Sequence, residues 1–244
     1  MSPRVSTLTV LLLVAGLAGC SSARPEEAPG PPLPTQLVAK LVSPTDITLA
    51  WKSTQTDVAG RTVEFATEQD GQYTILQFVS PSQTTYEHRD LMPETTFYYR
   101  VRPFFGPASR PVEVTLPPGE YDENSPDDEE WAKPHSDAKG PVPAQTIRNP
   151  TGAEAAAPTD FVATVMNPNG IKFTWTDRAS DEEGYLLEAK PDGSADYTPV
   201  EVLDPNITSV GLITLPNEKK ASYRVRAFYY GESSNIAHQK TGNG

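Results

Sequence analysis

Cysteine and histidine are scarce in this chain of 244 residues, which has one cysteine, Cys20, and three histidines. A single cysteine excludes an internal disulfide framework and a zinc site built from several cysteines. The histidines form no His-Glu-x-x-His pair, and the chain has no Gly-x-Ser-x-Gly elbow, phosphate-binding loop or dinucleotide fingerprint. We therefore expect a protein that is not an enzyme, with no catalytic residues, no metal and no other cofactor.

Positive charge is also low, since 20 Lys and Arg stand against 32 Asp and Glu and the net charge is −12. Half of this excess lies in residues 117–157, which hold 3 basic and 9 acidic residues. Binding to the backbone of a nucleic acid needs clustered Lys and Arg. We therefore expect no nucleic-acid partner.

Long hydrophobic runs are absent except near the start, where residues 8–16 form an apolar stretch. This stretch is shorter than the roughly 20 residues of a transmembrane helix and is typical of a signal peptide. It ends in Leu17-Ala18-Gly19-Cys20, which resembles the lipobox of bacterial lipoproteins. The resemblance implies a signal peptide over residues 1–19 and acyl chains on Cys20 that anchor the protein to a membrane. The alternative is an ordinary secretory signal with a chance cysteine.

Residues 20–33 follow the lipobox and are rich in proline, which predicts an extended tether. Ser21 stands where the enteric sorting rule would have Asp in a protein retained at the inner membrane. We therefore expect an extracytoplasmic lipoprotein, anchored at the outer membrane.

The rest of the chain contains two copies of one unit, related by an offset of 124 residues. The matched positions include Pro34 with Pro158, Trp51 with Trp175, Glu64 with Glu188, and Tyr99-Arg100-Val101-Arg102 with Tyr223-Arg224-Val225-Arg226. The copies cover residues 34–116 and 158–241, which we call the first and second repeat. We expect each repeat to fold independently.

Apolar and polar residues alternate in both repeats, as in Ile47-x-Leu49-x-Trp51 and Ile171-x-Phe173-x-Trp175. This period of two, broken by turns such as Asp70-Gly71 and Asn169-Gly170, predicts antiparallel strands with one buried face. Two such faces packed together form an all-β sandwich. We expect Trp51 and Trp175 in the cores.

Several motifs resemble the fibronectin type III domain. These are Pro34 and Leu37 at the first strand, Trp51 at the end of the second, Leu91-Met92-Pro93-Glu94-Thr95, and Arg100-Val101-Arg102. The second repeat has Tyr223-Arg224-Val225-Arg226-Ala227. The resemblance implies two immunoglobulin-like, antiparallel β-sandwiches over about two-thirds of the chain. It does not imply integrin binding, because the turns that follow the Arg-Val-Arg strand of each repeat lack Arg-Gly-Asp.

Residues 117–157 join the repeats, and their acidity, low hydrophobicity and six prolines in residues 118–157 predict a disordered acidic linker. Trp131 is unusual there. It could anchor a partner that docks on the linker, fold back on a neighbouring repeat, or lie in solvent.

Two further sets of residues are candidates for a role. Glu64 and Glu188 recur at one position, and we expect them to point outward as solvated partners of Arg or Lys. A possible contact patch is formed by aromatic residues that we expect to be exposed near the ends of the two repeats, namely Phe104, Phe105, Phe228, Tyr229 and Tyr230.

The sequence leaves two functions open. One is a non-catalytic, membrane-anchored module that binds an unknown protein or polysaccharide. The other is a purely structural spacer or assembly subunit of the cell envelope. The fold does not choose between them.

Overall fold

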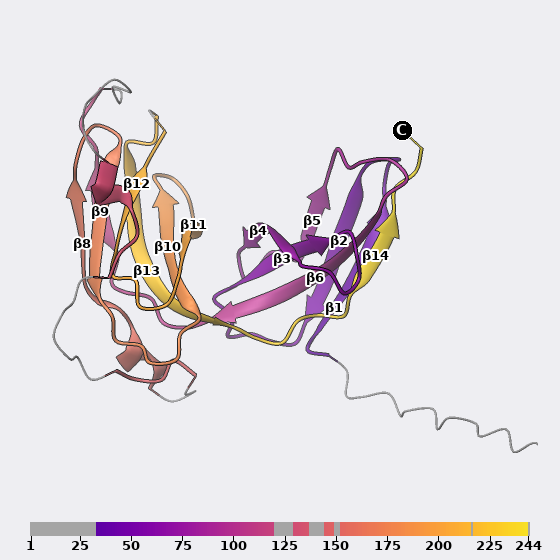
Figure 1. The fold of residues 1–244 in the computed structure, drawn as a ribbon, viewed down its shortest axis with the longest axis horizontal. Helices are drawn as coiled ribbons and strands as arrows, with labels where there is room; N and C mark the ends of the chain where they lie inside the picture. Colours follow the sequence, from indigo (N-terminus) through magenta and orange to yellow (C-terminus); the bar gives the residue numbers. More distant parts are fainter. Residues whose placement is uncertain (1–32, 120–128, 137–143, 149–151, 216, 244) are drawn as a thin grey trace, which may run out of the picture. The chain divides into compact units, whose positions relative to one another are not determined.

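The computed structural model describes residues 33–119, 129–136, 144–148, 152–215 and 217–243. Leu33–Gly244 is one compact unit. The predicted all-β, antiparallel architecture is confirmed (Figure 1). The first repeat contains the strands β1 (Thr35–Leu41), β2 (Ile47–Ser53), β3 (Gly60–Ala66), β4 (Thr74–Val79), β5 (Thr85–His88), β6 (Thr96–Phe105) and β7 (Val112–Thr115).

Two short 3-10 helices follow, η1 (Glu129–Ala132) and η2 (Ala153–Ala156), and the second repeat then has a matching series of strands. Its strands are β8 (Thr159–Val165), β9 (Gly170–Thr176), β10 (Gly184–Pro191), β11 (Thr198–Leu203), β12 (Ser209–Ile213), β13 (Lys220–Tyr230) and β14 (Ala237–Lys240).

Each repeat buries one core between two antiparallel sheets. Sheet β1-β2-β5 covers the first core and sheet β12-β9-β8 covers the second, each packed against strands of a longer sheet with the order β11-β10-β13-β6-β3-β4. Trp51 is 3% exposed and Trp175 is fully buried, so both tryptophans lie in the cores as predicted. The alternating burial along β1 and β2 is the period-two pattern of half-buried strands.

The last strands of the two repeats are exchanged, which corrects the expectation of two independent units with boundaries at 34–116 and 158–241. Strand β7 of the first repeat pairs with β13, with Val114 opposite Ala221. Strand β14 of the second repeat pairs with β6, with Ala237 opposite Tyr99. In Figure 1 the yellow β14 accordingly lies among the indigo and purple strands of the first repeat.

The path of β6 and β13 explains the exchange. The C-terminal ends of the two strands pair with each other, Phe104 opposite Tyr230 and Phe105 opposite Tyr229. The segment that follows each of these strands therefore begins beside the other repeat. The exchanged strands then complete the other repeat's core, because Val114 is buried among residues of the second repeat and Ala237 among those of the first.

The described parts of the acidic linker pack on the second repeat, which corrects the prediction of a disordered linker for these residues. The amide of His135 donates to the carbonyl of Ser209 at 3.0 Å, and the amide of Ser209 donates back to His135 at 3.0 Å. Ile147 is 2% exposed and belongs to the second core. Residues 120–128, with Asp127 and Asp128 of the acidic run, lie outside the described residues.

Trp131 folds back on the second repeat, one of the three outcomes that the sequence left open. Its ring lies over Gly170 and Gly211, where an added Cβ would come within 2.6 and 2.5 Å of ring atoms. The first repeat has Asp46 and Glu87 at the matching positions. The two glycines therefore make a hollow for Trp131 that only the second repeat has.

Replacing Gly211 by the glutamate of the first repeat should displace Trp131. Gly211→Glu places a side chain in space that the ring occupies, and such overpacking costs about 1–3 kcal/mol. We expect the amide of His135 to exchange with deuterium at least about tenfold faster. Gly193→Asn is the matched control, since Gly193 has no atom within 4 Å of an added Cβ and Asn tolerates its positive φ of 83°. Unchanged exchange at His135 in Gly211→Glu would contradict this packing.

Candidate functional site

The aromatic residues proposed as an exposed contact patch lie instead between the two repeats. Phe104 and Phe228 are each 2% exposed and meet edge to face, with ring centroids 6.5 Å apart. Gly60 and Gly184 occupy the same position in the two repeats, and each leaves room for one of these rings. The expectation of exposure is wrong for Phe104 and Phe228, because the ends of β6 and β13 pair and bury these two side chains. Phe105, Tyr229 and Tyr230 are half-buried.

Phe105 and Tyr229, also in the proposed patch, stack with centroids 5.4 Å apart. The guanidinium of Arg148 lies 4.4 Å from the centre of the Tyr229 ring and pairs with Glu183 at 2.7 Å. The end of the linker is thus fastened to the junction of the repeats. Tyr230 covers the guanidinium of Arg102 at 4.2 Å. All five aromatic residues therefore have contacts within the chain.

Glu64 and Glu188 are buried, at 1% and 2% exposure, so the prediction that they are solvated is wrong. Glu64 accepts from Arg100 Nε at 2.6 Å and from Arg102 Nε at 3.2 Å. Tyr73 lies over the Arg100 guanidinium at 4.2 Å. The arginine and tyrosine side chains cover the carboxylate and bury it. The alternation of the strand shows only that Glu64 points away from the core, and does not show that neighbouring side chains cover it.

The second repeat has the same cluster. Glu188 accepts from Arg224 and, at 2.9 Å, from Arg226 Nε, while Tyr197 covers Arg224 at 4.0 Å. Arg226 also donates to the carbonyl of Gly106 at 2.6 Å. The buried ion cluster of the second repeat is therefore tied to the first repeat at its exit from β6.

Both ion clusters are paired within the chain. The carboxylates are already paired with two guanidiniums, and burial raises the pKa of nearby tyrosines such as Tyr230. Burial also lowers the pKa of His88, which shares a hydrogen bond of 3.1 Å with Tyr99 in the first core. Within the part of the chain that the structure describes, no three His, Cys, Asp or Glu side chains are grouped to hold a metal ion.

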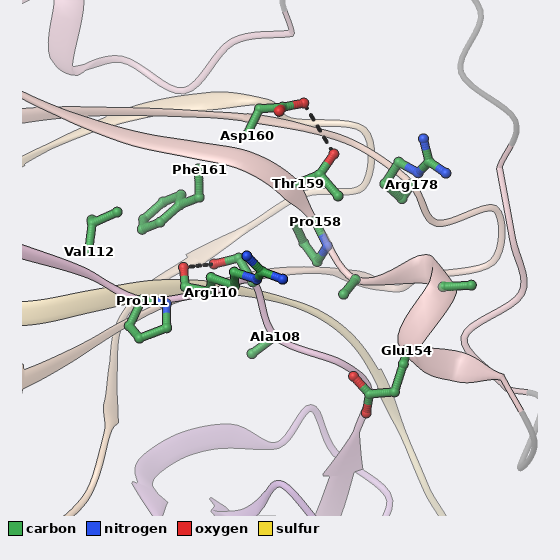
Figure 2. Close-up of a pocket in the computed structure, with 13 residues that line it drawn as sticks. Ala108, Arg110, Pro111, Val112, Glu154, Pro158, Thr159, Asp160, Phe161 and Arg178 are labelled. Carbon is green, nitrogen blue, oxygen red and sulfur yellow. Dashed lines mark hydrogen bonds between the residues drawn. The ribbon is translucent and has the colours of Figure 1, made fainter.

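A cavity of about 720 Å³ is the strongest candidate site among the described residues. It opens on the second repeat, between β7, which comes from the first repeat, and the start of β8 (Figure 2). Its lining is Ala108, Ser109, Arg110, Pro111, Val112, Glu154, Ala155, Ala157, Pro158, Thr159, Asp160, Phe161 and Arg178. Figure 2 draws Phe161 and Val112 toward one end and Glu154 and Arg178 toward the other. The volume is within the roughly 300–1,000 Å³ of ligand pockets.

At the same place in the first repeat one side chain bridges the two neighbouring segments. Asn235 accepts from the amide of Leu37 at 2.8 Å and donates to the carbonyl of Leu37 at 3.0 Å. It follows Ser234, whose hydroxyl accepts from the amide of Val101 at 3.0 Å. The side chain of Asn235 thus clamps β1 to the segment that leads into β14.

In the second repeat the corresponding positions are filled differently. Ser109 takes the place of Ser234 and accepts from the amide of Val225 at 3.1 Å. The next residue is Arg110 instead of asparagine, and Phe161 stands where the first repeat has Leu37. The cavity is therefore the site at which the second repeat lacks the asparagine clamp.

The start of β8 is displaced beside this opening. Its register with β9 shifts between Thr159 and Val162, and Asp160 has a positive φ of 53°. The Asp160 carboxylate accepts from the hydroxyls of Thr176 at 2.8 Å and Thr159 at 3.2 Å, which holds the bulge. A bulge of this kind ends regular pairing and redirects side chains.

Two arginines line the cavity. The side chains of Arg110 and Arg178 have no ion pair or hydrogen bond with any described residue, and Nε of Arg178 is buried. Sequence reasoning missed both arginines. The available signal was the mismatch of Arg110 with Asn235 when the repeats are aligned on their Ser residues.

Cys20 lies outside the described residues, together with the rest of residues 1–32. No helix in the described ranges is long and apolar enough to cross a membrane.

No protein-family model and no curated protein matches the chain. Among solved structures, the pectate lyase PelI from Erwinia chrysanthemi, in complex with tetragalacturonic acid, is similar at 18% identity and a TM-score of 0.28. That match covers 29% of this chain and 23% of the other, so the chain spans less than a quarter of that structure. A redesigned β-sandwich protein is similar at 20% identity and a TM-score of 0.25, over 28% of this chain and 72% of the other. Neither likeness bears on function.

Proposed function

We propose that this protein is a non-catalytic, lipid-anchored envelope protein that acts as a binding or adaptor module. The anchor is Cys20, at the end of the signal-like leader. The observation that supports binding is the cavity between β7 and β8, which is lined by two arginines whose side chains have no partner among the described residues. The matching place in the first repeat has the Asn235 clamp instead. Strand β7, which the first repeat contributes, forms one wall of this cavity.

A purely structural spacer is the second candidate. It is favoured by the burial of Phe104 and Phe228 between the repeats, because the aromatic patch then serves the chain itself. A spacer needs reach and rigidity but no ligand. The two functions therefore differ in whether the cavity contacts another molecule.

The anchor is tested by Cys20→Ala. Without the thiol no acyl chain can be attached, and we expect the protein to move from the membrane fraction to the soluble fraction or to remain uncleaved. Ser22→Ala is the control and should stay with the membrane. Membrane association and processing that do not change in Cys20→Ala would refute the lipoprotein assignment.

Binding is tested in intact cells by a photoreactive residue at Glu154, an exposed position on the cavity rim. The control carries the same residue at Lys52, exposed on β2 of the first repeat and away from the cavity lining. An adaptor should give a discrete crosslinked product from position 154 alone. A spacer should give none from either position.

A further inference from the structure

We propose that the cavity between β7 and β8 receives an extended peptide segment that carries a carboxylate. This inference rests on the proposed binding function and names its ligand class. Three observations support it: the open strand edges, the missing clamp, and two guanidiniums without a partner among the described residues.

Two strand edges face the cavity. Among the described strands, β7 pairs with β13 alone and β8 pairs with β9 alone, so each has an edge with no strand beside it. Val112 of β7 and Phe161 of β8 both line the opening. Unpaired edges offer backbone donors and acceptors, and an extended peptide satisfies them by strand addition.

The first repeat shows what kind of group fits between such edges. There the planar amide of Asn235 accepts from and donates to the backbone of Leu37, as a peptide group of a neighbouring strand would. The second repeat has Phe161 in place of Leu37 and no amide in place of Asn235. A peptide group from another molecule would take the role that Asn235 has in the first repeat.

The charges of the lining select an acidic segment. Arg110 and Arg178 have no partner among the described residues, whereas Asp160 is held by two hydroxyls and Glu154 is exposed at the rim. A guanidinium binds a carboxylate through charge-assisted hydrogen bonds, which are about twice as strong as neutral ones.

The probe is a fluorescein-labelled octapeptide amide that alternates threonine and valine around one central glutamate, with a matched peptide that has glutamine instead. We expect saturable binding by fluorescence anisotropy to the full chain, and binding of the glutamine peptide weaker by about tenfold, the scale of one charged hydrogen bond. Equal binding of the two peptides, or no binding of either, would overturn the proposal.

Arg110→Asn gives the sharpest variant, because it installs the asparagine clamp of the first repeat. We expect it to lower the affinity for the glutamate peptide at least about tenfold while thermal unfolding occurs at the same or a higher temperature. Arg178→Gln should weaken the same peptide by a similar factor and leave the glutamine peptide unaffected. Arg89→Gln, at an exposed arginine paired with Glu87 in the first repeat, is the control and should bind both peptides as the parent does.

An alginate tetrasaccharide separates an acidic peptide from an acidic glycan. Binding of this probe in place of the peptide would overturn the peptide assignment. A crosslinked product from position 154 without peptide binding would leave the adaptor function standing and reject the ligand class. The absence of both would reject both.

Discussion

Removal of β14 should unfold the first repeat and spare the second, although β14 belongs to the second repeat in sequence. A chain that ends at Ile236 loses the pairing with β6 and the buried Ala237. It also loses Thr241, whose hydroxyl donates to the carbonyl of Met92 and accepts from the amide of Thr95. At about 1 kcal/mol for each hydrogen bond, the free energy of unfolding of the first repeat should fall by roughly 3–5 kcal/mol.

Hydrogen–deuterium exchange resolved along the chain measures this effect. In the shortened chain we expect faster exchange along β6 and unchanged exchange along β13. Val114→Asp is the mirror variant, because it places a carboxylate in the second core from a strand that belongs to the first repeat. It should expose β13 and spare β6. Loss of protection within the repeat that carries each change, instead of the opposite repeat, would show that the strands are not exchanged.

Glu188→Ala should destabilise the second repeat by about 3–5 kcal/mol, because it leaves two guanidiniums beside a buried site with no carboxylate. Glu188 is 2% exposed and holds Arg224 and Arg226. Since Arg226 also donates to the carbonyl of Gly106, the junction between the repeats should loosen as well. Urea unfolding followed by far-ultraviolet circular dichroism measures the change in free energy.

Two comparisons make this prediction specific. Glu188→Gln keeps an acceptor for one arginine and should lose less stability than Glu188→Ala. Glu113→Ala removes an exposed carboxylate on β7 and should stay within about 0.5 kcal/mol of the parent. A loss below about 1 kcal/mol for Glu188→Ala would mean that the cluster is held mainly by its aromatic covers, such as Tyr197 over Arg224.

The strands and cores of both repeats could be predicted from sequence because these depend on local pattern. Alternation such as Ile47-x-Leu49-x-Trp51 places every second side chain on one face of a strand, and that face is buried wherever a second sheet packs on it. The 124-residue offset carried the same prediction to the second repeat. The positions of Trp51 and Trp175 follow from this pattern alone.

The candidate site could not be found in this way, because it depends on a difference between two copies at one three-dimensional position. Ser109 and Ser234 make the same hydrogen bond, but Arg110 and Asn235 diverge directly after it. Neither residue has a motif that marks it. Only the contact of Asn235 with Leu37 shows what the second repeat lacks.

By itself the sequence determined the all-β class, the repeat and the core tryptophans. Only the tertiary structure decided which last strand completes which core, since β7 and β14 follow equivalent strands and either could pair with its own repeat or the other. The choice follows from the pairing of the ends of β6 and β13, which buries Phe104 against Phe228 and directs each chain toward the opposite repeat. Residues more than 100 positions apart make that contact, and no local pattern encodes it.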